Sequence, residues 1–156
     1  MDDTEHELTK LHPNHLKMTR VVIALYAVPF VIGAIVLEIM RVAFFGVFIV
    51  PALLLFAILI LRFALRRYTA RGYDMSGDRL RVVRGIMFHS DTVVPFGRIQ
   101  HIDVDQGPLQ RVYGLATLTV HTAGTHNSSV QLPGLKHERA TEMREEIRRH
   151  IKRETL

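Results

Sequence analysis

The sequence predicts a two-helix transmembrane hairpin followed by an antiparallel β barrel or sandwich that is closed by a C-terminal α-helix. Three observations support this fold class. Residues 21–61 form an apolar block of 41 residues in which only Glu38 and Arg41 are charged. From Tyr68 onward, apolar and polar residues alternate in short runs separated by turn residues, which is typical of strands. The C-terminal residues then change to the spacing of an amphipathic helix.

The apolar block is too long for one membrane span. A single helix of this length would measure about 62 Å, roughly twice the hydrocarbon thickness of a bilayer. We therefore expect two spans, 21–37 and 42–61, joined at residues 38–41, with kinks at Pro29 and Pro51. A cleaved signal peptide is disfavoured by the polar leader and the immediate second span. A buried hairpin in a soluble protein is disfavoured because the rest of the chain is too small to cover it.

Basic residues determine the expected topology. The basic side chains that flank the outer ends of the hairpin are Lys10, Lys17, Arg20, Arg62, Arg66, Arg67 and Arg71. The join between the spans holds only one, Arg41, so both termini are expected in the cytoplasm and the protein in the cell membrane. The cluster Arg62, Arg66 and Arg67 is also expected to attract anionic headgroups without specificity, at about 1 kcal/mol for each charge.

The chain therefore divides into a polar N-terminal segment (1–20), the hairpin with its basic exit (21–67) and a cytoplasmic domain (68–156). The runs of alternating residues predict six strands in this domain, at 68–75, 79–86, 88–95, 99–105, 116–123 and 128–132. Pro108 and Gly114 predict one helical turn between the fourth and fifth strands, because proline suits a first helical position and glycine a left-handed cap.

A helix is expected to follow the last strand and to cover one opening of the sheets. Its apolar stripe consists of Ala140, Met143, Ile147 and Ile151. Charged residues fill the other faces of this helix, and Glu145 and Arg149 are spaced for an i,i+4 ion pair.

Two segments of the domain carry a specific motif. Residues 94–104 read VPFGRIQHIDV and residues 106–116 read QGPLQRVYGLA, and they are followed by TAG at 122–124. With two spans ahead of the domain, these segments resemble the bacterial pleckstrin-homology-like (PH-like) domains of the membrane-anchored, YdbS-like type. The resemblance covers about residues 21–151 and implies a PH-like barrel closed by a C-terminal helix, at the cytoplasmic membrane of a bacterium. It implies no catalytic residue, no ligand and no cofactor.

A polar set within this motif has two interpretations. The set consists of Arg98, Gln100, Gln106 and Arg111. In the first interpretation, which we favour, these side chains tie the helical turn to the neighbouring strand, because the donors of Arg111 satisfy carbonyls left open at that turn. In the second, they line a groove that binds a ligand or a peptide.

The sequence contains no signature of catalysis or metal binding. His101, His121 and His126 would approach one another if their strands are neighbours, but cysteine is absent and no helical His-x-x-x-His pair occurs. We therefore interpret them as surface histidines, and Asp103 with Asp105 as a solvated pair on one strand face. No nucleophile elbow or phosphate-binding glycine loop is present, so we expect no enzyme, no metal and no cofactor.

These observations predict a non-enzymatic interaction module at the inner leaflet that binds another membrane protein. An exposed sheet edge would accept a strand from such a partner. The alternative is a module that binds or senses lipid headgroups. Nucleic acid is excluded as a partner because the basic residues concentrate at the exit of the apolar block, not on a face of the domain. Homo-oligomerisation is left open.

Overall fold

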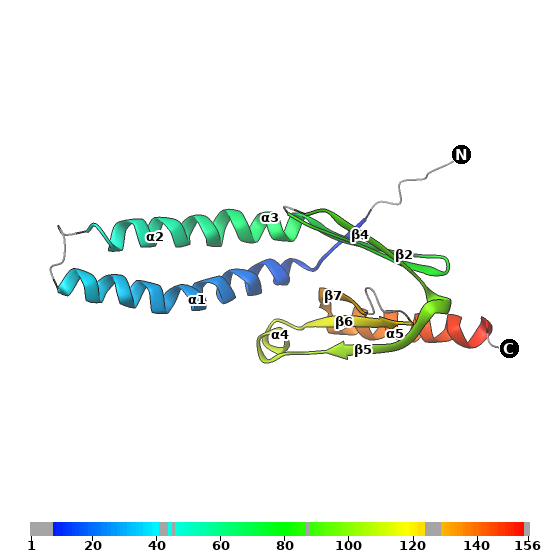
Figure 1. The fold of residues 1–156 in the computed structure, drawn as a ribbon. Helices are drawn as coiled ribbons and strands as arrows, with labels where there is room; N and C mark the ends of the chain where they lie inside the picture. The colour runs from blue at the N-terminus through cyan, green and yellow to red at the C-terminus, as the bar shows by residue number, and fades with distance from the viewer. Residues whose placement is uncertain (1–7, 41–43, 45, 87, 124–128, 155–156) are drawn as a thin grey trace.

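The fold consists of a long helical hairpin with a β domain at one end (Figure 1). A computed structural model describes residues 8–40, 44, 46–86, 88–123 and 129–154. Within this part of the chain, two apolar helices, antiparallel sheets and a C-terminal helix follow one another in the expected order.

The two arms of the hairpin are both long and apolar enough to cross a membrane. The first arm is α1 (Pro13–Ile39), and the second is built from α2 (Ile49–Ile58), the π-helical turn η1 (Leu59–Phe63) and α3 (Ala64–Thr69). Their mean hydropathies are 2.4 and 2.3, and only 6% of each apolar window is buried. The apolar surface of the hairpin is therefore turned outward, as a lipid environment requires.

The helices of the hairpin do not begin at the first residues of the expected spans. Helix α1 begins at Pro13 instead of residue 21, because proline suits the first turn and the His12 side chain accepts a hydrogen bond from the backbone N–H of Asn14. The second arm begins at Ile49 instead of residue 42, which places Pro51 in the first turn of α2, where its missing N–H breaks no helical hydrogen bond. No kink is needed there.

The expected join of the spans is only partly described. Arg41 lies outside the described residues, so its expected position beside Glu38 has no structural counterpart here. Glu38 itself accepts a hydrogen bond from the backbone N–H of Gly46, which links the end of α1 to the start of the returning arm.

The β domain contains two antiparallel sheets. The strands of the first sheet, in spatial order, are β1 (Thr9–Lys10), β2 (Arg71–Ser76), β3 (Arg79–Arg84) and β4 (Ser90–Pro95). Those of the second are β5 (Ile99–Asp105), β6 (Leu115–Thr122) and β7 (Ser129–Lys136). A short 3-10 turn, η2 (Phe96–Arg98), connects the sheets. All six expected strands are present. Among the described residues the two sheets are not closed into a barrel, and β4 and β5 are edge strands that do not pair with each other.

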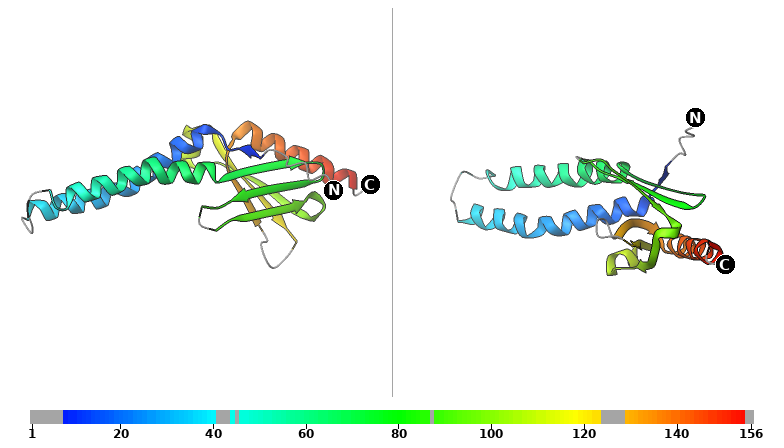
Figure 2. Two further views of the ribbon diagram at one scale, coloured as in Figure 1. Left: turned by 90° about the horizontal axis from the view of Figure 1, so that it is seen from above. Right: turned by 45° about the vertical axis from the view of Figure 1, so that its right-hand side comes forward.

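The core lies between the two sheets and α5 (His137–Glu154), which lies across the second sheet (Figure 2). The expected stripe of α5 faces this core: Ala140, Met143 and Ile147 are fully buried, and Ile151 is partly buried. The expected pairing of Glu145 differs in detail. Its carboxylate contacts Arg144 and Arg148, whereas Arg149 donates to the backbone carbonyl of Glu145.

The segment ahead of the hairpin forms part of the domain. Strand β1 pairs with β2, and Leu11 is only 2% exposed within the main core. The polar leader thus supplies an apolar side chain and a strand to the sheet that follows the hairpin.

Helix α4 (Pro108–Val112) is the expected helical turn, and Gly114 caps it with a φ of +66°. Two glutamines, not Arg111, hold this turn in place. Gln110 accepts from the backbone N–H of Gly107 at 2.9 Å and donates to the Thr117 hydroxyl at 2.8 Å. Gln106 donates to the Leu115 carbonyl at 2.8 Å. Arg111 is exposed, so the carbonyl contacts expected of it are made by a shorter side chain nearby.

The packing of α5 predicts a strong contrast between its faces. Met143→Asp or Ile147→Asp places an unpaired charge in the core, so each should lower the unfolding free energy by about 3–5 kcal/mol. Arg148→Gln removes only a surface ion pair and should cost less than about 1 kcal/mol. Thermal unfolding of the full chain in detergent measures this, since a fragment that begins at Tyr68 would lack β1 and Leu11. Equal losses at the three positions would contradict the packing.

The hydrogen bonds of α4 give a second prediction. Gln110→Ala leaves the N–H of Gly107 and the hydroxyl of Thr117 without their partner, which should cost about 1–3 kcal/mol of stability. Arg111→Ala removes an exposed side chain and should change stability by less than about 0.5 kcal/mol. The same thermal measurement compares them, and a larger loss for Arg111→Ala than for Gln110→Ala would refute this assignment.

Candidate functional site

The hairpin and the β domain meet at a junction with almost no linker. Strand β1 is followed closely by α1, and only Ala70 separates α3 from β2. The Tyr68 hydroxyl donates to the Leu11 carbonyl at 2.8 Å, so the two places where the chain passes between hairpin and domain are bonded to each other. Gly85, just after β3, donates its N–H to the carbonyl of Ala70 at 3.2 Å. The β3–β4 connection therefore lies beside the end of α3.

His15 is buried at this junction. It lies in the first turns of α1 and is 5% exposed. Its ring packs on Gly134 of β7, whose φ is +81° and where an added Cβ would lie 2.6 Å from the Cγ of His15. Within the described part of the chain, the Nδ1 atom of His15 has no hydrogen-bond partner. Glycine at position 134 thus makes room for a polar ring that helix α1 carries into the domain.

Three arginines gather around the junction. Arg71 begins β2 and Arg84 ends β3, and the two residues are direct partners across the strands. Arg67 comes from the last turn of α3. Burial lowers the pKa of the Arg71 guanidinium, and the like charges of Arg67 and Arg84 lower it further. Among the described residues, no carboxylate forms an ion pair with any of the three.

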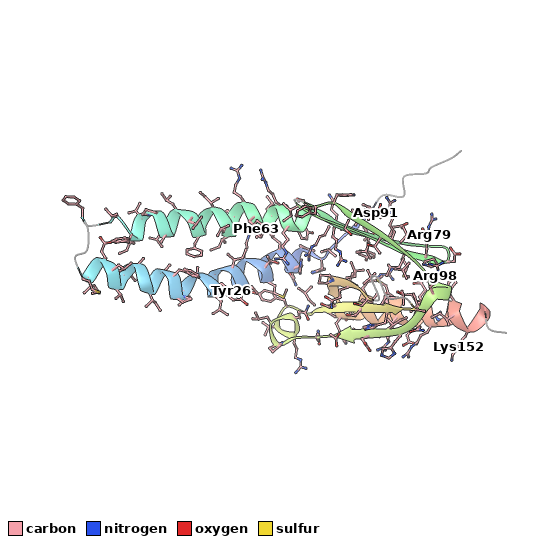
Figure 3. All side chains as sticks on the ribbon, in the orientation of Figure 1. Tyr26, Phe63, Arg79, Asp91, Arg98 and Lys152 are labelled. Atoms are coloured by element: carbon pink, nitrogen blue, oxygen red, sulfur yellow. The ribbon has the colours of Figure 1, made fainter. Side chains whose placement is uncertain are left out.

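Two cavities adjoin these arginines, and all three arginines line both. The inner cavity has a volume of about 230 Å³ and also contacts Leu11 and His15. The outer one has a volume of about 410 Å³, and its other lining residues are Phe63, Gly85, Ile86, Phe88 and Ser90. Phe63 lies on the returning arm where it approaches the β domain (Figure 3). We call the three arginines with their two cavities the junction pocket.

The structure divides the basic cluster that the sequence indicated. Arg62 and Arg66 are exposed and line neither cavity, whereas Arg67 lines both. Sequence reasoning placed Arg71 among the basic residues at the exit of the hairpin, but it did not pair Arg71 with Arg84. The signal was present, because a tight turn at residues 77–78 places position 71 opposite position 84 when the two strands are paired outward from the turn.

The polar set of the sequence motif is not gathered in one place. Arg98 lies before β5, and Arg111 lies on α4 beyond the other end of that strand. Figure 3 shows Arg98 at the end of the domain far from the hairpin. Gln100 is exposed on β5, and Gln106 is bonded to the carbonyl of Leu115. An interaction role for this set stays a prediction.

Two histidines of the second sheet lie in a surface cluster with Asp103. His101 and His121 are partners across β5 and β6, and both contact Asp103, at 2.7 Å and 3.4 Å. His126 lies outside the described residues. Asp105 is exposed at the end of β5. Within the described part of the chain, no three side chains are placed to hold a metal ion.

Comparisons with known proteins fit this architecture. Residues 16–152 match the sequence model of the family described as Bacterial PH domain. The chain is also similar to the transmembrane protein YdbS of Bacillus subtilis (strain 168), with 35% identity over 83 residues, which make up 53% of this chain and 50% of YdbS. The match thus spans about half the length of that relative. No solved structure matches significantly.

The family match covers most of the chain, from the first turns of α1 to the last turns of α5. It includes most of both apolar arms, the strands from β2 to β7 and most of the closing helix, but not β1. The chain therefore belongs to the bacterial PH domain family, with its PH-like domain joined to a membrane hairpin.

Proposed function

We propose that this protein is a non-enzymatic interaction module that presents its PH-like domain at the inner leaflet of the cell membrane and binds another membrane protein there. The junction is the observation that carries the proposal. Because the chain passes between hairpin and domain with almost no linker, and Tyr68 bonds to Leu11 across it, the domain stays close to the membrane surface. A domain held in this way meets partners that are themselves at the membrane.

The open sheet edges supply a binding mode for a protein partner. Strands β4 and β5 each pair on one side only within the described chain. An extended segment that adds to such an edge gains main-chain hydrogen bonds, and neighbouring side chains provide selectivity. Val93 on β4 is 49% exposed and would contact the added strand. Under this proposal, a second copy of this chain also qualifies as the partner.

Lipid-headgroup binding is the second candidate, and the junction pocket favours it. Three arginines without a carboxylate partner in the described chain lie where the second arm meets the domain. The proposal assigns no reaction, because the family is not a known enzyme family and the polar set of the motif is spread along the domain.

The topology of the proposal can be tested by cysteine labelling, since the natural chain contains no cysteine. Phe44→Cys, between the end of α1 and the start of α2 and 90% exposed, should react with a membrane-impermeant maleimide in intact cells. Asp78→Cys, in the exposed β2–β3 turn, should react only after the cells are permeabilised. Labelling of Asp78→Cys in intact cells would place the domain outside and refute the proposal.

The partner can be tested by photocrosslinking in native membranes. A photoreactive residue at Val93 should form an adduct with one defined membrane protein, or with a second copy of the chain, because that side chain borders the open edge of β4. The matched control is the same residue at Arg149, which is exposed on α5. Identical adducts from both positions, or adducts with lipid alone at Val93, would argue against edge binding.

A further inference from the structure

The junction pocket contains an arrangement of charge that destabilises the folded protein. Arg71 and Arg84 face each other across neighbouring strands, and like charges directly opposite each other are unfavourable. Arg71 is also partly buried, so part of its hydration is lost without a protein carboxylate in the described chain to replace it. An anion between these guanidinium groups would offset the repulsion.

The chemistry of the pocket selects the kind of anion. Guanidinium groups present a planar fork of donors that matches the oxygens of a phosphate group, often in pairs of hydrogen bonds. The Ser90 hydroxyl borders the outer cavity beside Arg84, its partner across the strands. We propose that Arg67, Arg71 and Arg84 form a phosphate-binding site whose ligand is the headgroup phosphate of an anionic phospholipid.

The surroundings of the arginines favour a lipid over free phosphate. Phe63, Ile86 and Phe88 border the outer cavity and are 41%, 43% and 84% exposed. Apolar side chains of this kind suit the glycerol and upper acyl region of a lipid whose phosphate lies on the arginines. Phe63 ends η1, and Ile86 and Phe88 lie in the β3–β4 connection, which is bonded to the end of α3 through Gly85 and Ala70, so all three are next to the expected headgroup layer.

His15 gives an independent indication that the inner cavity holds a polar group. It is 5% exposed, lines that cavity and has no partner for Nδ1 in the described chain. A buried polar atom without a hydrogen bond is costly, and a ligand oxygen or a bridging water would satisfy it. The inference rests on the proposed placement of the domain at the inner leaflet, because only there does the pocket meet headgroups of that leaflet.

The second arm of the hairpin provides matched controls for the test. Arg62 and Arg66 carry the same charge as Arg67, lie at most five residues from it and line neither cavity. A purely diffuse attraction to anionic lipid would depend on all of these charges alike. A built site would depend on Arg71 and Arg84 far more than on the two controls.

The experiment titrates the full chain in neutral detergent with dioctanoyl phosphatidic acid, dioctanoyl phosphatidylcholine and inorganic phosphate. Native mass spectrometry counts bound lipid, and the melting temperature reports binding because a ligand of the native state stabilises it. We expect saturable one-to-one binding of phosphatidic acid. Arg71→Gln and Arg84→Gln should weaken it by about tenfold or more, as expected for a lost charge-assisted hydrogen bond. Arg62→Gln and Arg66→Gln should change it by less than about twofold.

The remaining outcomes decide the proposal. Absence of saturable binding, or equal losses in all four variants, would overturn the site in favour of diffuse surface charge. Inorganic phosphate bound as tightly as phosphatidic acid would support the phosphate chemistry and overturn the lipid assignment. If Arg71→Gln does not fold, Arg71→Lys and Arg84→Gln decide, because lysine keeps the charge and loses the fork. Binding in detergent does not depend on topology. Cysteine labelling could therefore refute the expected topology while the titration supports the site, or support the topology while the titration refutes the site.

Discussion

The seat of helix α1 on strand β7 is the contact on which the placement of the whole domain depends. Gly134 is the extra residue of a bulge, since Thr117 pairs with Pro133 and Ala116 with Leu135. Its positive φ and missing side chain admit the His15 ring, and its carbonyl accepts a hydrogen bond from the backbone N–H of His12. One irregular residue therefore joins the second sheet to the segment that also supplies β1 to the first sheet. The two open sheets are bridged there without a closed barrel.

The packing of α1 on β7 places His15 beside the three arginines of the junction pocket. With α3 beside β2, Arg67, Arg71 and Arg84 all border the inner cavity, although Arg67 is itself exposed. Arginines at a membrane exit usually extend into water or the headgroup layer, and Arg62, Arg66 and Arg67 are all exposed. Arg71 is less free to do so because it is held in the ladder of β2 opposite Arg84. Perturbed ionisable groups cluster at functional sites, which is the reason to assign a ligand to this pocket.

The sequence predicted what depends on local periodicity. The hairpin followed from apolar length, the strands from alternation, the α5 stripe from helical spacing, and the cap at Gly114 from its place after a helical turn. Strand β1 was missed because two residues carry no period. Its pairing with β2 also joins segments on opposite sides of the hairpin, which alternation within one run cannot reveal. Barrel closure could not be judged from alternation either, because alternation along a strand does not show which strands pair: β4 and β5 are separated only by η2, yet they lie in different sheets.

The sites show the same division between local and distant information. We expected Arg111 to connect the α4 turn to the neighbouring strand because arginine has the most hydrogen-bond donors. Gln110 makes these hydrogen bonds instead, because of its position in the turn. Gln110 lies in the first turn, where its amide reaches back to the N–H of Gly107 and across to Thr117, and the longer Arg111 side chain points to solvent. The junction pocket combines residues from a helix end, two strands and the leader, so no single run of sequence could indicate it. What the sequence did contain was the turn at residues 77–78, from which the facing of Arg71 and Arg84 follows by strand pairing alone.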